Sequence, residues 1–161
     1  MQEKASVTSI VIAGIGGQGV ITISDILAEA VFSSGFDVKK SEIHGMSQRG
    51  GSVTSDIRFG EKVYSPSVPV GGADFLLVVS PDQLSRNQRL LKPDGLALSA
   101  DRIDSAQLPN ARSINLAVLG MLAPHLPAIA ATTWEQAIRS VMPEKLHQTA
   151  LPAFELGRAC Q

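Results

Sequence analysis

The sequence has almost no cysteine, and this absence excludes several kinds of site. Cys160 is the single cysteine among 161 residues. One cysteine cannot form an intrachain disulfide, and it cannot supply the ligands of an iron–sulfur cluster or a cysteine-rich zinc site. A free thiol near the end of the sequence is expected, with no metal site in this chain. The lack of disulfides suits a reducing compartment, so we expect a cytoplasmic protein.

Long hydrophobic runs and an excess of charge of one sign are also missing. No apolar stretch approaches the roughly 20 residues that cross a bilayer, so no membrane contact is expected. The chain has 14 basic and 15 acidic residues, and this balance gives no general reason to expect nucleic acid as a partner. Its 44% hydrophobic content is that of a globular protein. We expect one domain over residues 1–161.

The N-terminal third reads as a β-α-β unit. The run Thr8–Ala13 is β-branched and apolar, which is typical of a strand buried on both faces. A glycine loop, Gly14–Gly19, follows, and from Val20 the apolar residues recur every three or four positions, as on one face of a helix. Gly35 stands where a helix C-cap is expected. The segment Asp37–Ser41 predicts the second strand.

The middle of the chain predicts a hairpin and a central strand. Apolar and polar residues alternate over Ser52–Phe59, which indicates a strand with one less buried face. A tight turn at Gly60-Glu61 would lead into Lys62–Ser65 and form an antiparallel hairpin at the sheet edge. The apolar run Phe75–Val79 predicts a central strand. The expected fold class is α/β: a single three-layer Rossmann-like domain, mostly parallel sheet with an antiparallel hairpin.

The C-terminal half is expected to be helical. Helices are predicted over Asn115–Leu126, from Thr132 with a capping box, and over Glu144–Leu156 with an end at Gly157. Pro152 lies inside the last of these patterns, and an interior proline costs about 3 kcal/mol or more, so we expect a kink or a break there. Trp134 is interpreted as a packing anchor.

The first glycine loop, G-I-G-G-Q-G, matches the G-x-G-x-x-G pattern. Glycines let the backbone approach a phosphate, and the N-terminus of the following helix offers unpaired N–H groups. A nicotinamide dinucleotide would also require an acidic residue at the end of the second strand. Neither Asp37 nor Glu42 is well placed for that role. An anion site, a dinucleotide site and a purely structural turn all remain open.

A second loop, within S-E-I-H-G-M-S-Q-R-G-G at Ser41–Gly51, is rich in polar groups. Arg49 can bind a phosphate or carboxylate with two parallel hydrogen bonds, and the glycines after it let backbone amides join in. His44 is a possible catalytic acid or base, or a simple hydrogen-bonding group. The alternative is a polar loop that caps local backbone, with Arg49 paired to an acidic neighbour.

Several motifs together resemble one family. They are G-I-G-G-Q-G-V at Gly14–Val20, S-E-I-H-G-M-S-Q-R-G-G-S-V at Ser41–Val53, V-Y-S-P at Val63–Pro66, S-I-N-L-A-V-L-G at Ser113–Gly120 and A-F-E-L-G at Ala153–Gly157. The chain resembles the gamma-type domain of 2-oxoacid:ferredoxin oxidoreductases, and most of all the beta subunits of indolepyruvate ferredoxin oxidoreductases. The resemblance runs from about residue 8 to residue 157.

The resemblance implies a subunit that is inactive alone. The complex would convert an arylpyruvate, coenzyme A and oxidised ferredoxin into an aryl-acetyl-CoA, carbon dioxide and reduced ferredoxin. It also implies that thiamine diphosphate, Mg²⁺ and iron–sulfur clusters belong to a large partner subunit, while this domain helps to bind CoA and closes over the site. The residues that would face the cofactors are Gly14, Gly16, Gly17, Gln18, Gly19, Ser47, Gln48, Arg49, Gly50 and Gly51.

Two other functions remain as alternatives. One is a stand-alone Rossmann-like dinucleotide-binding module, which would bind NAD(P). The other is a structural or regulatory subunit whose loops only contact a partner.

Overall fold

The computed structural model describes residues 6–44 and 51–160, which build one five-stranded sheet and its helices. The strands lie in the order β2-β3-β1-β4-β5. Their bounds are β1 Val7–Ile15, β2 Asp37–His44, β3 Ser52–Gly60, β4 Ala73–Val78 and β5 Leu91–Ser99. The α-helices are α1 Val20–Ser33, α2 Leu84–Asn87, α3 Ile114–Leu122, α4 Ala131–Val141 and α5 His147–Ala159.

Four of the five strands point in the same direction. β1 pairs in parallel with β4, and β4 pairs in parallel with β5. β3 is antiparallel to both of its neighbours, β1 and β2, so β2 runs in the direction of β1. The β1-α1-β2 crossover is therefore present, with β3 inserted between its two strands. The expected α/β class and the mixed character of the sheet are confirmed.

The expected place of the hairpin was wrong. β3 forms its hairpin with β2, and Lys62–Ser65 has no strand conformation. β3 also lies inside the sheet, and the edge strands are β2 and β5. The alternation along β3 suggested an edge strand with one less buried face. In the structure, the loop 61–72 covers that polar face, and its backbone hydrogen-bonds to polar side chains there.

Side chains of β2 and β3 hold this loop against the sheet. The Asp37 carboxylate accepts the Val63 N–H at 2.8 Å, and the Asp56 carboxylate accepts the Val68 N–H at 2.9 Å. The Arg58 guanidinium donates to the Ser65 carbonyl at 2.9 Å. The loop therefore completes the layer on the side of the sheet that faces away from α1.

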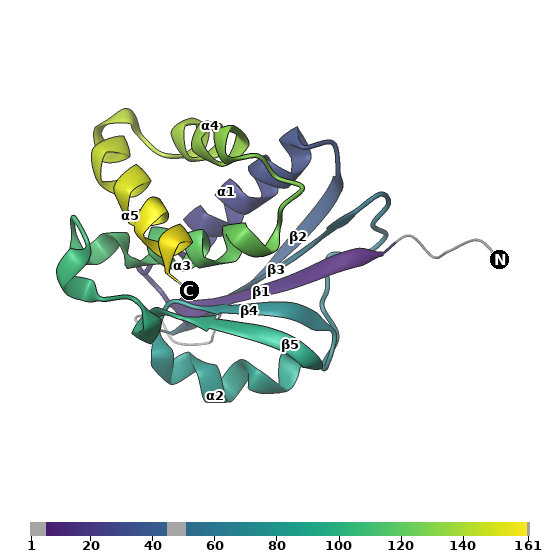
Figure 1. The fold of residues 1–161 in the computed structure, drawn as a ribbon. Helices are drawn as coiled ribbons and strands as arrows, with labels where there is room; N and C mark the ends of the chain where they lie inside the picture. The colour runs from purple at the N-terminus through teal and green to yellow at the C-terminus, as the bar shows by residue number, and fades with distance from the viewer. Residues whose placement is uncertain (1–5, 45–50, 161) are drawn as a thin grey trace.

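The two faces of the sheet carry very different amounts of structure (Figure 1). Helices α1, α3, α4 and α5 lie together on one face, and α2 lies on the other. The larger core cluster joins β-strand residues such as Ile10 and Ile57 to those four helices. The smaller cluster contains Val11, Val68 and Leu76. The three-layer description is thus confirmed, with one thick and one thin helical layer.

The helix α1 forms where its apolar spacing predicts it. Its buried apolar residues all face the core, and they are Val20, Ile23, Ile26, Leu27, Ala30 and Val31. The helix ends at Ser33, and Gly35 follows with φ of 92°. This left-handed conformation suits glycine, because it has no Cβ to clash. The helix and its stop signal were predicted correctly.

Two glycines allow α3 and α5 to pack closely. A Cβ on Gly157 would lie 1.8 Å from the Ala117 carbonyl oxygen, and one on Gly120 would lie 2.1 Å from the Phe154 carbonyl oxygen. The expected helix end at Gly157 was wrong, since α5 runs on to Ala159. Pro152 does not break it either, because the packing against α3 outweighs the missing hydrogen bond.

The capping box expected at the start of α4 is absent. The helix begins at Ala131, and its N-cap residue Ala130 makes no side-chain hydrogen bond. Trp134 is 1% exposed and packs against Phe154 with ring centroids 5.5 Å apart. Its interpretation as a packing anchor is confirmed.

Candidate functional site

The first glycine loop and Gly51 of the second lie at one end of the sheet, where β1 and β2 end and β3 begins. The backbone N–H of Gly16 donates to the carbonyl oxygen of Gly51 at 2.9 Å. In the adjoining ladder, Ile15 is the register partner of Ser52. Carboxyl ends of parallel strands are where open α/β sheets bind ligands. The structure thus joins the two segments that the sequence singled out.

Val53 relates His44 to the glycine loop. It is the register partner of Gly14 on one side and of His44 on the other. Neighbouring strands are about 4.8 Å apart, so the His44 backbone is roughly 10 Å from Gly14 across the sheet. The His44 side chain is exposed. It is near the glycine loop, but it is not buried in a pocket of the kind that tunes a catalytic base.

The glycine loop is held in shape by its own backbone and by Gln18. The Gln18 side-chain oxygen accepts the Ile15 N–H at 2.8 Å, and the Gln18 N–H donates to the Ile15 carbonyl at 3.1 Å. Gly17 and Gly19 have φ of 90° and 76°, values that favour glycine. A Cβ on Gly14 would lie 2.7 Å from a Val20 methyl group. In this arrangement the Gln18 oxygen shapes the loop, so it is not directed at a ligand.

The N-terminus of α1 has the character of an anion site. Its N-cap, Gly19, offers no side-chain hydrogen bond, and its first turn has no acidic residue. Among the residues that the structure describes, none accepts a hydrogen bond from the N–H of Gly17 or Gly19. Gly16 and Gly17 are exposed. A helix end with free N–H groups and a positive dipole end attracts phosphate or carboxylate.

Asn115 is a site residue that the sequence reasoning missed. Its side-chain nitrogen donates to the Gly19 carbonyl at 3.3 Å, across 96 residues of chain. A Cβ on Gly19 would lie 2.3 Å from that nitrogen. Asn115 is itself buried at the start of α3. A polar residue inside the apolar run S-I-N-L-A-V-L-G was the available signal.

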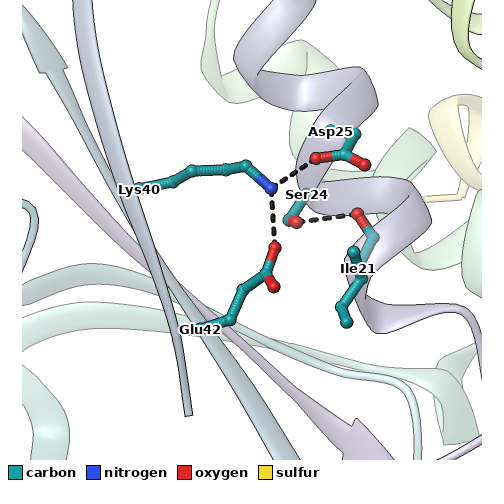
Figure 2. A network of polar contacts seen from close by, with 5 residues as sticks. All are labelled: Ile21, Ser24, Asp25, Lys40 and Glu42. Carbon is teal, nitrogen blue, oxygen red and sulfur yellow. Dashed lines mark hydrogen bonds and ion pairs between the residues drawn. The ribbon is translucent and has the colours of Figure 1, made fainter.

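An ion-pair network connects α1 to β2 beside this edge (Figure 2). The Lys40 ammonium contacts the Asp25 carboxylate on α1, and it donates to the Glu42 carboxylate at 2.7 Å. Burial alone would lower the pKa of Lys40, but the hydrogen bonds to these two carboxylates outweigh it and raise the pKa. Asp25 thus pairs across to β2 while its side chain stays 41% exposed.

This network also shows which face His44 occupies. Side chains two residues apart in a strand point to the same face. Lys40 contacts α1, so Glu42 and His44 lie on the α1 side of the sheet as well. His44 is therefore on the same side as the N-terminus of α1, where a bound anion would lie.

Neither Asp37 nor Glu42 has the position and the free carboxylate that a dinucleotide site requires at the end of the second strand. Asp37 opens β2 at the opposite end of the strand, and its carboxylate holds the Val63 N–H. That hydrogen bond lowers the pKa of Asp37. Glu42 is paired with Lys40. The structure gives no support for ribose recognition by either carboxylate.

The segment after β4 places the negative charge of Asp82 on the β4 side of the glycine loop. The Val79 N–H donates to the Ala13 carbonyl at 2.9 Å, so the chain after β4 lies beside the glycine loop. The next residue, Ser80, donates its hydroxyl proton to the Asp82 carboxylate and lowers the pKa of Asp82. An anionic ligand would be repelled from that side and favoured on the side of α1.

Four of the expected site residues, Ser47, Gln48, Arg49 and Gly50, lie outside the described residues. Across the described ranges 6–44 and 51–160, no group of three or more His, Cys, Asp or Glu side chains is arranged to hold a metal ion. In the same ranges, no helix has the length and apolarity needed to span a membrane.

The fold and the geometry of this site define a class: a Rossmann-like α/β domain in which a glycine loop precedes α1 and is hydrogen-bonded to Gly51 at the start of β3. Within that class the chain belongs to the pyruvate ferredoxin/flavodoxin oxidoreductase family. The sequence model of this family matches residues 9–109.

Relatives in sequence point to one group of enzymes. The chain is 45% identical over 94 residues to the indolepyruvate oxidoreductase subunit IorB of Thermococcus kodakarensis, covering 58% of this chain and 46% of that protein. It is 28% identical over 171 residues to the common gamma subunit of the pyruvate/ketoisovalerate oxidoreductases of Pyrococcus furiosus, covering 88% and 92%. The first of these alignments spans about half the length of the curated relative.

Solved structures share the fold. A keto/oxoacid ferredoxin oxidoreductase gamma subunit from Geobacter sulfurreducens has a TM-score of 0.77 at 21% identity, with 97% of both chains covered. A 2-oxoglutarate:ferredoxin oxidoreductase from Magnetococcus marinus, solved with 2-oxoglutarate, coenzyme A and succinyl-CoA bound, has a TM-score of 0.80 at 21% identity. It covers 98% of this chain and 31% of that one.

Proposed function

We propose that this chain is a non-autonomous subunit of a 2-oxoacid:ferredoxin oxidoreductase that acts on an arylpyruvate such as indolepyruvate. It binds coenzyme A together with a large partner subunit and closes the active site. The partner carries thiamine diphosphate, Mg²⁺ and the iron–sulfur clusters, and passes electrons to ferredoxin. The complex works in the cytoplasm.

The observation that carries the proposal is the hydrogen bond between Gly16 and Gly51. It fixes the glycine loop against the start of β3, directly after the segment that contains Arg49. The N-terminus of α1 therefore lies close to Gly51, and Arg49 precedes Gly51 by two residues in the sequence. Such an arrangement fits the diphosphate of coenzyme A, which carries two negative charges and many acceptor oxygens.

The residues of this chain would act by binding and positioning. The N–H groups at the start of α1 would hold the diphosphate, and Gly17 and Gly19 would let it approach the backbone. Ser47, Gln48 and Arg49 would complete the contact. His44 stands on the same side of the sheet, within reach of a ligand that extends past the loop, and could act there as an acid or base.

The cofactors of the partner supply the redox chemistry and the decarboxylation. This chain contributes position and exclusion of water, which strengthens electrostatic interactions at the shared site. A family in which similar subunits serve pyruvate, 2-oxoglutarate and indolepyruvate enzymes fits this division. The preference for an arylpyruvate rests on the higher identity to the indolepyruvate subunits.

The test is to purify the chain alone and with its large partner. Oxidation of indolepyruvate, phenylpyruvate, pyruvate and 2-oxoglutarate would be followed by ferredoxin reduction, with and without CoA. We expect no turnover by the chain alone, CoA-dependent turnover by the complex, and the highest kcat/KM with an arylpyruvate. Turnover by the isolated chain, or CoA-independent turnover by the complex, would contradict the proposal.

One variant and one binding measurement separate this function from its alternatives. Arg49→Ala should weaken CoA binding in an assembled complex. If it weakens assembly and leaves CoA affinity unchanged, the chain is a structural subunit. Micromolar binding of NAD(P) to the chain in calorimetry, without a signal for CoA, would favour the dinucleotide-binding module.

A further inference from the structure

A cavity with a mixed polar and apolar lining lies beside the glycine loop, on the other side of Asn115. It encloses about 250 Å³ between the first turn of α1 and the starts of α3 and α5. Its polar lining residues are Thr22, Asn110, Arg112, Ser113, Asn115 and Thr149. Asn115 contacts Gly19 as well, so one residue separates the cavity from the N-terminus of α1.

Both asparagine side chains present hydrogen-bond donors. The Asn110 side-chain oxygen accepts the Arg112 N–H at 2.9 Å, and the Asn115 side-chain oxygen accepts the Leu116 N–H at 2.9 Å. A backbone N–H can only face the oxygen of an amide, so these bonds fix the orientation of both groups. Their nitrogens are then available for other contacts. Asn115 uses one of its two N–H groups for the Gly19 carbonyl.

The charge of the cavity is positive. Arg112 is the one charged side chain among the described residues that line it. Within the described part of the chain, no carboxylate lies within 4 Å of the Arg112 guanidinium. Three other cavities are different, because each has a carboxylate in its lining, from Glu155, Glu61 or Asp104. A group that enters beside Arg112 is therefore expected to be an anion.

Two of the three hydroxyl groups in the lining, those of Ser113 and Thr149, are hydrogen-bonded to the backbone. The Ser113 hydroxyl donates to the Asn110 carbonyl, and the Thr149 hydroxyl donates to the Leu146 carbonyl at 3.1 Å. These bonds hold the walls in place at the starts of α3 and α5. The cavity is thus a formed feature of the fold, and Arg112 at its rim can bind a ligand without breaking them.

The size of the cavity suits one group of a larger ligand. Pockets that hold a whole drug-sized molecule enclose roughly 300–1,000 Å³, and this one encloses about 250 Å³. Arg112 and Asn115 are three residues apart, so their Cα atoms are separated by at most about 11 Å. A ligand held at the N-terminus of α1 could therefore place a second charged group beside Arg112.

We propose that this cavity binds the 3′-phosphate of coenzyme A through Arg112, while the N-terminus of α1 binds the diphosphate. The inference rests on the proposed function, and it adds a residue that recognises the phosphorylated ribose. A phosphate monoester carries close to two negative charges at neutral pH, and the planar guanidinium can bind it with two parallel hydrogen bonds. Asn110 and Asn115 would supply further donors.

The test compares CoA with dephospho-CoA, which lacks only the 3′-phosphate. Calorimetry would measure both ligands against the full chain and against its complex with the large subunit. A charged hydrogen bond contributes enough to expect CoA to bind about tenfold more tightly than dephospho-CoA. Arg112→Gln should weaken CoA about tenfold and change dephospho-CoA by less than about twofold. Arg112→Lys should retain part of the difference.

The matched control is Arg102→Gln. Arg102 is also exposed, but it lines a different cavity near the C-terminus. It should leave both affinities unchanged. If Arg112→Gln changes both ligands equally, or neither, the assignment of the 3′-phosphate is overturned while CoA binding by the wild type keeps the proposed function. If the wild-type complex binds neither ligand, both proposals fail.

Discussion

The carboxylate of Asp56 accepts a hydrogen bond from the backbone N–H of Val68 at 2.9 Å, although Asp56 is only 7% exposed. Burial raises the pKa of Asp56, and the hydrogen bond from Val68 opposes the shift only in part. The Asp56 carboxylate thus holds the loop 61–72 in place, although its burial disfavours the charged form and so lowers the stability of the fold.

Replacing Asp56 with asparagine should stabilise the protein at neutral pH. The folded pKa is raised, so the folded state binds a proton that the unfolded state releases between about pH 3.9 and the folded pKa. The contribution of Asp56 to stability is present below this window and lost as the pH rises through it. Asparagine can still accept the Val68 N–H, without a charge. Urea unfolding from pH 4 to 8 should show Asp56→Asn gaining on the wild type as the pH rises.

Asp37→Asn is the matched control, because Asp37 holds the same loop with a pKa shift of the opposite sign. The hydrogen bond from Val63 lowers the pKa of Asp37. Its contribution is present above about pH 3.9 and lost as the pH falls through the folded pKa. Asp37→Asn should therefore lower stability at neutral pH. Equal pH profiles for the two variants would contradict this account.

Gly157→Ala should strongly destabilise the contact between α3 and α5. The added Cβ would meet the Ala117 carbonyl oxygen at 1.8 Å, and backbone cannot rotate away. Overpacking costs typically 1–3 kcal/mol and occasionally more, so we expect a loss of about 3 kcal/mol in the free energy of unfolding. Gly16→Ala is the control, since its Cβ would meet only the Gly51 carbonyl, at 3.8 Å. If the midpoint temperature of thermal unfolding fell equally in both variants, helix packing would not be the cause.

Gly19→Ala and Asn115→Ala should be coupled. Alanine at 19 would have φ of 76° and a Cβ 2.3 Å from the Asn115 nitrogen. We expect a loss of about 2 kcal/mol from backbone strain and crowding together. Removing the Asn115 side chain should relieve the crowding, so the double variant should be more stable than the sum of the single losses predicts. Additive losses in a double-mutant cycle would show that the two residues do not compete for space.

Lys40→Met should weaken the protein modestly, in a way that depends on salt. The Lys40 side chain is 29% exposed, and its ammonium pairs with Asp25 and Glu42. Ion pairs near the surface contribute about 0–1 kcal/mol and are screened by salt. The loss in unfolding free energy should shrink between low and 1 M salt. Lys39→Met, which changes a more exposed lysine 3.8 Å from Asp37, is the control and should have a smaller effect.

Local patterns predicted the elements whose partners are close in sequence. The spacing of Ile23, Leu27 and Val31 predicted α1, and Gly35 predicted its end, because both depend on a few neighbouring residues. These features do not require knowledge of distant contacts.

Features that depend on distant contacts were missed. The polar face of β3 suggested an edge strand, since nothing in the segment shows that Asp56 and Arg58 bind a later loop. Gly157 looked like a helix end because its real reason, the approach of Ala117, lies 40 residues away. Asn115 escaped notice for the same reason, because its partner is Gly19. In each case the residue type is visible in the sequence, but its role depends on a contact with a residue far away in the chain.

The position of β3 has a consequence for how the site can change. Because Val53 is the partner of Gly14 on one side and of His44 on the other, a single strand sets the register of both loops. Inserting or deleting one residue in β3 would turn its side chains to the opposite faces and shift both loops together. We therefore expect length changes within β3 to disrupt both parts of the site at once. The pairing of β3 with both β1 and β2 therefore fixes the positions of the glycine loop and of His44 relative to each other.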